Sequence, residues 1–319
     1  MKSFSAHGKL LLTGEYLVLK GAIALGLPTR LGQSLTVQAR KERHCDRELA
    51  KREATQPDPK LLYWNAFQPS GPWFSAALDP VTLEIIDTDD PSKAEKLAKI
   101  LKAVRELNAN AFEPGLCFET HLEFDPSWGL GSSSTLISVL SQWAGVNPYE
   151  LLKMTLGGSG YDIACATASS AIHYRLDHGQ PMIQPVEFNL PFADRLFFVY
   201  QGKKQHSSNE VKAFNQHWEQ ADLSSEMQTV SELGMALPTV TYFEDFCTLL
   251  QVHESILSRC LDREPVQLQY SGFNGVLKSL GAWGGDFLLA ATELSYEEVC
   301  KYFKDKGLTT IFKYQDLIL

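Results

Sequence analysis

Three glycine-rich segments contain the residues whose types and spacing could support chemistry. The first, WGLGSSST at residues 128–135, places two glycines and four hydroxyl residues before the apolar run LISVLSQW. Apolar residues recur at helical spacing from Leu136 to Trp143, which predicts a helix that starts near Ser132. A helix N-terminus presents unpaired N–H groups and a partial positive charge, and glycines allow the backbone to approach a bulky anion. The segment therefore predicts a phosphate-binding loop, with a capped structural turn as the alternative.

The serines of this segment add oxygen ligands to the loop. Ser132, Ser133 and Ser134 can donate hydrogen bonds to phosphate oxygens or ligate Mg²⁺, a hard cation that prefers oxygen. No GK[ST] follows the glycines, so the segment is not a Walker loop, and no GxSxG marks a nucleophile elbow. We therefore expect a phosphate cradle of another type.

The other two segments strengthen this prediction. GGSGYDIACATASS at residues 157–170 places Asp162 in a glycine-rich loop, as a functional carboxylate or as a helix N-cap. KSLGAWGGDFLLA at residues 278–290 is a glycine-dense loop that runs into an apolar strand. Three such loops in one chain are hard to explain as turns alone.

The composition excludes some classes of partner. The chain has 319 residues and no long polar break, which predicts a large core and two domains that share an interface. Its formal net charge of −9 argues against nucleic acid or an anionic membrane as the main partner, because both select a basic face. A local basic pocket for a small anionic molecule is compatible with that charge.

Cysteine usage and apolar run lengths indicate a cytoplasmic protein. The six cysteines lack the spacing of a metal site, and we expect them to be reduced thiols: Cys45, Cys117, Cys165, Cys247, Cys260 and Cys300. The N-terminus lacks an apolar signal segment, and no run of about eighteen apolar residues predicts a membrane span.

Alternating strand and helix patterns favour an α+β fold. A helix is predicted over 91–107, and a strand over 116–124 runs into the first glycine-rich segment. The second half predicts a strand from RLFFVYQG, helices across 208–260, and a strand from DFLLAAT. A last helix is marked by Ser295 at its start and Gly307 at its end.

Four segments, in this order, resemble the GHMP kinases, the family of galactokinases and of homoserine, mevalonate and phosphomevalonate kinases. AHGKLLLTGEYLVLKGAIALGLP is similar to the opening motif, PSWGLGSSST to the phosphate loop, GSGYDIA to the segment with the catalytic aspartate, and KSLGAWGGDFLLA to the third motif. The likeness covers nearly the whole chain. It implies an ATP-binding domain like domain 2 of ribosomal protein S5 at residues 1–180 and a ferredoxin-like domain at residues 181–319.

The resemblance also implies roles in phosphoryl transfer from ATP. Asp162 matches the aspartate that takes or orients the acceptor's hydroxyl proton, and Lys9 matches the lysine that stabilises negative charge on that oxygen. A carboxylate and an ammonium beside one hydroxyl let it ionise as it attacks the γ-phosphorus. Phosphoryl transfer otherwise requires mainly positioning and charge neutralisation.

The same resemblance implies the ligands of ATP and Mg²⁺. The residues that match the backbone cradle of the triphosphate are Gly129, Leu130, Gly131 and Ser132. Ser133 matches the serine that ligates Mg²⁺, and Glu15 matches the acidic residue of the opening motif and is expected to ligate the same ion. A turn carboxylate after Gly14 is the alternative for Glu15.

Two tryptophans depart from the family's pattern. Trp283 stands where the third motif generally has glycine, so we expect a shifted loop or an indole that covers the nucleotide. Trp128 stands where phosphomevalonate kinases often carry lysine, which argues against a phosphorylated acceptor.

The expected acceptor is mevalonate or phosphomevalonate. GEYLVL and GSGYD favour the phosphomevalonate kinase branch, and Lys203, Lys204 and Arg30 offer cations for a small anionic acceptor. An exposed basic loop is the alternative for QGKKQHSSNEV. Other candidate functions are a kinase for homoserine or a sugar, a mevalonate diphosphate decarboxylase, and a nucleotide-binding protein without catalysis. Both a monomer and a homodimer are compatible with the sequence.

Overall fold

The computed structural model describes residues 1–39, 58–203, 214, 218, 222–283 and 285–319, which form two compact units. Unit 1 contains Met1–Ala6, Gly32–Pro126 and Ser132–Gly158. Unit 2 contains His7–Leu31, Ser127–Gly131 and Ser159–Leu319. The predicted domains, 1–180 and 181–319, divide the chain differently, because the long strands β1 (Lys2–Thr13) and β2 (Ala24–Ala39) each contribute residues to both units.

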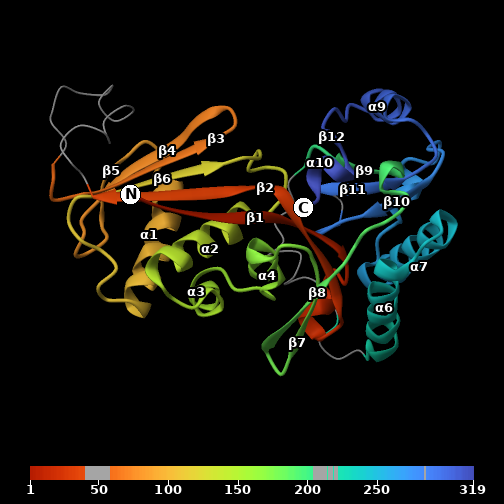
Figure 1. The fold of residues 1–319 in the computed structure, drawn as a ribbon, viewed down its shortest axis with the longest axis horizontal. Coiled ribbons are helices and arrows are strands. Elements are labelled where there is room, and N and C mark those ends of the chain that lie inside the picture. The colour runs from red at the N-terminus through yellow and green to blue at the C-terminus, as the bar shows by residue number, and fades with distance from the viewer. Residues whose placement is uncertain (40–57, 204–213, 215–217, 219–221, 284) are drawn as a thin grey trace. The chain divides into compact units, whose positions relative to one another are not determined.

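In unit 1, three helices cover one face of a sheet (Figure 1). The strands pair in the order β5 (Ile85–Thr88), β4 (Gly71–Leu78), β3 (Leu62–Gln68), β6 (Leu116–Leu122) and the second half of β2. The helices α1 (Pro91–Leu107), α2 (Ser132–Ala144) and α3 (Pro148–Thr155) pack against one another. Helix α1 buries an apolar stripe and α2 begins at Ser132, so both helices predicted from periodicity are confirmed.

In the first part of unit 2, a short helix packs on a β-hairpin. Strand β2 pairs through Ala24–Gly26 with β7 (Ala171–Asp177), which pairs in turn with β8 (Gln180–Val186). Helix α4 (Tyr161–Thr167) packs on β7, and the 3₁₀ helix η1 (Leu17–Lys20) follows β1. A Cβ atom at Gly26 would lie only 2.8 Å from the Sγ atom of Cys165, so the lack of a side chain lets α4 approach β2.

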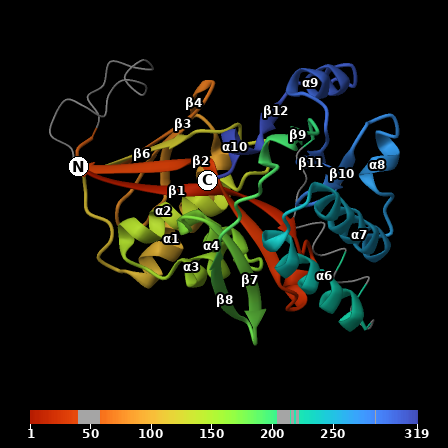
Figure 2. The same cartoon turned by 45° about the vertical axis from the view of Figure 1, so that its right-hand side comes forward.

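The second part of unit 2 contains a four-stranded antiparallel sheet (Figure 2). Its order, β10 (Val276–Ser279), β11 (Phe287–Ala291), β9 (Leu196–Tyr200) and β12 (Ile311–Lys313), is that of the expected ferredoxin-like domain. The helices of this part are η3 (Ala193–Arg195), α6 (Ser224–Ala236), η4 (Leu237–Thr239), α7 (Phe243–Leu261), α8 (Val266–Gln269), α9 (Tyr296–Lys304) and α10 (Tyr314–Leu317). Ser295 and Glu298 form the capping box of α9, as their spacing predicts.

Most of the described cysteines are free thiols. Cys165, Cys247, Cys260 and Cys300 agree with the prediction, whereas Cys117 is disulfide-bonded, which corrects the prediction for that residue. Cys45 lies outside the described residues. No helix in the described ranges is both long enough and apolar enough to cross a membrane.

The close packing at Gly26 predicts that Gly26→Ala destabilises the protein. The added methyl group would meet the Cys165 sulfur at 2.8 Å, so α4 must shift. Overpacking of this kind costs about 1–3 kcal/mol, which urea denaturation measures as a lower free energy of unfolding. Gly272→Ala is the matched control, because its Cβ atom would have no neighbour closer than 3.9 Å. Equal losses in the two variants would contradict the packing argument.

Candidate active site

Lys9 on β1 is bound to the first glycine-rich loop through both its side chain and its backbone. Its Nζ atom donates to the carbonyl oxygen of Gly129 at 2.7 Å, and its backbone N–H donates to the carbonyl oxygen of Leu130 at 2.9 Å. Because each peptide unit is planar and trans, these carbonyls turn the N–H groups of Leu130 and Gly131 away from Lys9. The lysine therefore occupies one side of the loop, and backbone N–H groups point to the other.

Glycines make this close approach possible. Gly129 and Gly131 have φ angles of 72° and 93°, in the left-handed region that favours glycine. A Cβ atom at Gly8, next to Lys9, would lie 2.9 Å from the carbonyl oxygen of Leu130. The glycines of HGK and WGLG thus permit the same close approach between β1 and the loop.

Asp162 and Tyr161, at the start of α4, act electrostatically on Lys9. Asp162 is partly exposed, and the Lys9 Nζ atom lies 5.7 Å from the centre of the Tyr161 ring. Burial alone would lower the pKa of Lys9, but Tyr161, Asp286 and Asp162 together raise it above its ordinary value. Burial also raises the pKa of Tyr161 to about 12. At neutral pH, Lys9 is therefore a charged ammonium and Tyr161 a neutral phenol.

Asp286, which the sequence patterns do not single out, lies against the same loop. A Cβ atom at Gly129 would lie 2.5 and 2.7 Å from the two carboxylate oxygens of Asp286. The backbone N–H of Asp286 donates to the carbonyl oxygen of Lys203 at 2.7 Å, and its carbonyl accepts from the N–H of Gln201 at 2.8 Å. Three loops therefore meet at this residue. In the sequence, only its position at the end of the KSLGAWGGD run pointed to Asp286 as a site residue.

The cations predicted to bind the acceptor differ in their surroundings. Lys203 is exposed, and its backbone contact with Asp286 places it at the cluster around Lys9. Arg30 instead donates from its Nε atom to the carbonyl oxygen of Gln315, in α10, at 2.9 Å. Lys204 lies outside the described residues.

The serines at the start of α2 differ in exposure. Ser133 is exposed and Ser132 is partly exposed, whereas Ser134 has only 2% of its surface exposed. The burial of the Ser134 hydroxyl favours Ser132 and Ser133 over Ser134 as side-chain ligands of a phosphate or Mg²⁺. Ser132 and Ser133 keep hydroxyls that a ligand at the helix N-terminus could reach.

Glu15 forms a buried ion pair. Its Oε1 atom accepts a hydrogen bond from Nζ of Lys278 at 2.7 Å, and neither side chain is more than 1% exposed. Burial raises the pKa of Glu15 to about 7, against the lowering effect of Lys278. This pairing engages the carboxylate within the fold, and the role of Glu15 as a Mg²⁺ ligand stays a prediction. Within the described residues, no group of three His, Cys, Asp or Glu side chains could hold a metal ion.

Two residues of α7 extend this buried network. The Nε2 atom of His253 accepts the N–H of Gly14 at 3.1 Å and lies 3.4 Å from Oε2 of Glu15. Burial and the neighbouring lysine lower the pKa of His253 well below its ordinary value, so the ring is neutral. Glu254 accepts from the N–H of Ser279 at 3.0 Å and from its hydroxyl at 2.9 Å. Helix α7 thus connects the opening motif to the strand that precedes the third glycine-rich segment.

The two tryptophans that depart from the family's pattern are packing residues. Trp283 is 1% exposed and lies in an apolar cluster with Tyr16 and Leu257. The expectation that its indole covers a nucleotide is therefore wrong. Trp128 packs edge-on against Phe312, with ring centres 5.2 Å apart, so it supports the loop from the side of the C-terminal sheet.

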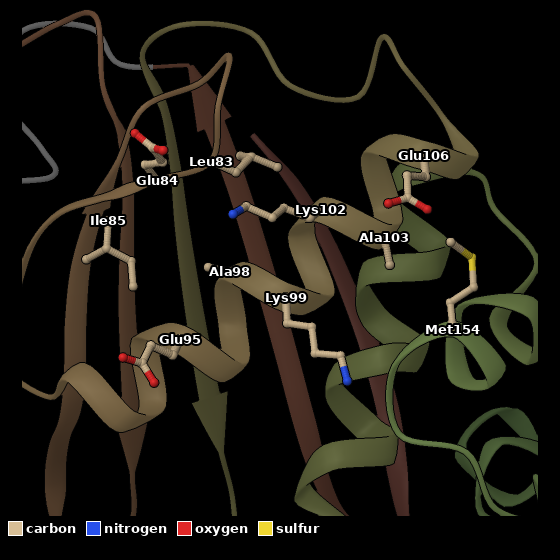
Figure 3. A pocket seen from close by; sticks show the side chains of 10 residues that line it. All are labelled: Leu83, Glu84, Ile85, Glu95, Ala98, Lys99, Lys102, Ala103, Glu106 and Met154. Carbon is tan, nitrogen blue, oxygen red and sulfur yellow. The ribbon is translucent and has the colours of Figure 1, made fainter.

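A separate depression of about 750 Å³ lies on α1 in unit 1 (Figure 3). Its lining mixes apolar side chains with charges of both signs: Leu83, Glu84, Ile85, Glu95, Ala98, Lys99, Lys102, Ala103, Glu106 and Met154. None of these is a predicted site residue, and Lys99 donates to the carbonyl oxygen of Thr155 at 3.0 Å. The candidate active site is therefore the cluster around Lys9.

Solved structures share the fold of this chain. Phosphomevalonate kinase from Streptococcus pneumoniae, in complex with phosphomevalonate and AMPPNP, matches 98% of this chain and 100% of its own with a TM-score of 0.69 and 17% identity. Mevalonate kinase from Methanococcus jannaschii matches 98% and 96% with a TM-score of 0.67 and 16% identity. Mevalonate kinase from L. major, in complex with R-mevalonate, matches 98% and 95% with a TM-score of 0.65 and 18% identity.

The similarity is one of structure. No protein-family model matches the sequence, and no curated protein matches it significantly. The solved structures nevertheless cover nearly the whole chain, so the predicted two-domain α+β fold of these kinases is confirmed.

The buried His253 predicts a component of stability that is lost in acid. The unfolded chain takes up a proton near pH 6.5, whereas the folded ring has a lowered pKa and does not. This component is therefore present above pH 6.5 and falls by up to about 1.4 kcal/mol per pH unit below it. His253→Gln should be less stable than wild type at pH 7.5, and the difference should shrink between pH 6.5 and 5.

Urea denaturation at several pH values measures this difference. Glu15 acts in the opposite sense, because its raised pKa removes stability as the pH rises through about 7. Wild type and His253→Gln both contain Glu15, so its effect cancels in the difference between them. His178→Gln, at a side chain that is 98% exposed, is the control and should follow wild type at every pH. A constant difference between wild type and His253→Gln would show that the folded histidine titrates normally.

Proposed function

We propose that this protein is an ATP-dependent kinase that transfers the γ-phosphoryl group to a small anionic acceptor of the mevalonate type. The observation that carries the proposal is the hydrogen bond from the Lys9 ammonium to the Gly129 carbonyl, with the Asp162 carboxylate close enough to act on that ammonium. A glycine-rich loop, a cation and a partly exposed carboxylate then belong to one site. The fold shared with mevalonate and phosphomevalonate kinases supports this function.

Asp162 and Lys9 share the chemistry at the acceptor. Asp162 takes the proton from an acceptor hydroxyl as its oxygen bonds to the γ-phosphorus and the bond from that phosphorus to the bridging oxygen of ADP breaks. With a phosphate acceptor no proton needs to leave, and Asp162 orients the attacking group. The raised pKa of Lys9 keeps its ammonium charged, so it can stabilise negative charge on the acceptor oxygen.

The first glycine-rich loop holds ATP in this proposal. The backbone N–H groups of Leu130 and Gly131 point away from Lys9, and those of Ser132 and Ser133 follow at the N-terminus of α2, where the helix favours an anion. Mg²⁺ neutralises charge on the triphosphate when bound, and the exposed Ser133 hydroxyl fits as its protein ligand. Ser134 and Glu15, which are both buried, are weaker candidates for that role.

Mevalonate and phosphomevalonate are the proposed acceptors. The similar Streptococcus pneumoniae and L. major structures contain phosphomevalonate and R-mevalonate, respectively. Lys203 supplies a cation near Asp286, which supports an anionic acceptor. Arg30 is a weaker candidate, because its guanidinium already binds the carbonyl of Gln315.

Asp162→Asn should lower kcat at least about a thousandfold while ATP still binds. The amide keeps the size of the side chain but cannot take a proton or balance Lys9. An assay that couples ADP release to NADH oxidation measures kcat with mevalonate, phosphomevalonate, homoserine and galactose, and calorimetry measures ATP binding. Asp177→Asn, at a half-exposed side chain on the β-hairpin, is the control and should match wild type.

The same assay distinguishes the alternatives. Near-normal kcat in Asp162→Asn would remove the catalytic assignment. Turnover with only homoserine or galactose would show that this compound, and not mevalonate or phosphomevalonate, is the acceptor. Release of CO₂ from mevalonate diphosphate would indicate a decarboxylase. ATP binding without turnover of any acceptor would favour a nucleotide-binding protein without catalysis.

Lys203→Ala should raise KM for phosphomevalonate about tenfold or more and leave KM for mevalonate within about twofold. The phosphate of phosphomevalonate carries more charge than the carboxylate of mevalonate, so phosphomevalonate loses more binding free energy when one cation is removed. One charge-assisted hydrogen bond is worth about 1.5–3 kcal/mol. Lys153→Ala, at an exposed lysine on α3, is the control. Unchanged KM values for both acceptors would make Lys203 a solvent-exposed residue without a role in binding.

A further inference from the structure

Asp286 adopts a backbone conformation that few residues with side chains adopt. Its φ angle is 54°, in the left-handed region, and only 9% of its surface is exposed. Holding a residue other than glycine there costs about 1 kcal/mol or more, and glycine would remove that cost. The segment around Asp286 already contains several glycines, so an aspartate at this position indicates a use for its carboxylate.

The carboxylate lies where Lys9 meets the loop. Its oxygens fill the space that a Cβ atom at Gly129 would need, at 2.5 and 2.7 Å from that position. The carbonyl of the same Gly129 accepts the hydrogen bond from Nζ of Lys9. Asp286 therefore contacts the glycine to which the lysine is bonded, and its negative charge acts on the Lys9 ammonium.

Two hydrogen bonds hold the backbone that carries this carboxylate. The N–H and carbonyl groups of Asp286 are both bonded to the segment that follows β9, at Lys203 and Gln201. Strand β11 begins at the next residue, Phe287. At the other end of the segment, the Glu15–Lys278 pair and Glu254 anchor β10. The third glycine-rich segment is thus held at both ends.

We infer that Asp286 is a positioning residue of the proposed phosphoryl-transfer site, which holds the Lys9 ammonium at the Gly129 carbonyl and forms one wall of the phosphate-binding loop. This inference rests on the proposed function for its kinetic consequences. Its structural consequence, a lysine held and kept charged by a neighbouring carboxylate, can be measured without any substrate.

The position of the charge predicts opposite effects on catalysis and on nucleotide binding. Without the carboxylate, Lys9 is less well placed at the Gly129 carbonyl and its pKa is raised less, so kcat should fall. A negative charge beside the loop also repels a triphosphate, so its removal should not weaken ATP binding. If Asp286 only stabilised the fold, its replacement would lower kcat and weaken ATP binding together.

Asp286→Asn and Asp286→Gly test the inference. Asp286→Asn should lower kcat about thirtyfold, leave Kd for Mg²⁺-ATP equal or lower, and move the basic limb of the kcat/KM profile to lower pH. Asp286→Gly should lower kcat at least as much, with a Tm equal to or above that of wild type because the strained backbone is relieved. Should Asp286→Asn fail to fold, Asp286→Gly makes the same test.

Asp262→Gly is the matched control. Asp262 also has a φ angle in the left-handed region, 50°, but it is exposed at the C-terminal end of α7. Its replacement relieves the same kind of strain and should leave kcat and Kd unchanged. Loss of kcat in both glycine variants would show that backbone freedom, and not the carboxylate, is responsible, and would overturn the inference.

Labelling of Lys9 separates this inference from the proposed function. The protein is treated with acetic anhydride at pH values from 7 to 11, and acetylation of the peptide that contains Lys9 is measured by mass spectrometry. Lys9 should become reactive at lower pH in Asp286→Asn than in wild type, even if no acceptor is ever phosphorylated. Identical labelling profiles in the two folded proteins would overturn the inference, whatever the kinase assay shows.

Discussion

The hydrogen bond from the Lys9 ammonium to the Gly129 carbonyl is the interaction on which the rest of the site depends. It determines which side of the loop the lysine occupies and which side is left to backbone N–H groups. It also explains the glycines at positions 8 and 129, since a side chain at either position would collide with a neighbouring segment. The ammonium in turn needs negative neighbours, which Asp162 provides from the first turn of α4 and Asp286 from the third glycine-rich segment.

A second, fully buried group of charges supports this arrangement from a distance. Glu15 contacts both Lys278 and His253, and Glu254 binds the backbone of the strand that carries Lys278. Burying charges is unfavourable unless each finds a partner, so such a network tolerates few alternative arrangements. It connects the end of β1, helix α7 and strand β10. The segment that ends at Asp286 therefore starts from a strand whose position is well determined.

The chain shares the fold of known mevalonate and phosphomevalonate kinases at 16–18% identity, and two tryptophans pack around its glycine-rich segments. The indole of Trp283 lies in an apolar cluster with Tyr16 and Leu257. At position 128 another indole packs on the aromatic side chains of the C-terminal sheet. Both tryptophans pack beside glycine-rich segments, whereas the Asp162 carboxylate acts electrostatically on the Lys9 ammonium.

Local features follow from the amino-acid sequence alone: the helix that starts at Ser132, the capping box at Ser295, and the glycines that permit a close backbone approach. Each of these depends on residues within a turn or two, so spacing and residue type are enough to predict it. The burial of Ser134, the pairing of Glu15 with Lys278 and the contact of Asp286 with Gly129 depend instead on how distant segments pack. The partners in the Lys9–Gly129 and Glu15–Lys278 contacts are 120 and 263 residues apart. Periodicity shows which face of an element is apolar, but the exposure and charge state of a side chain depend on the distant segments that pack against it.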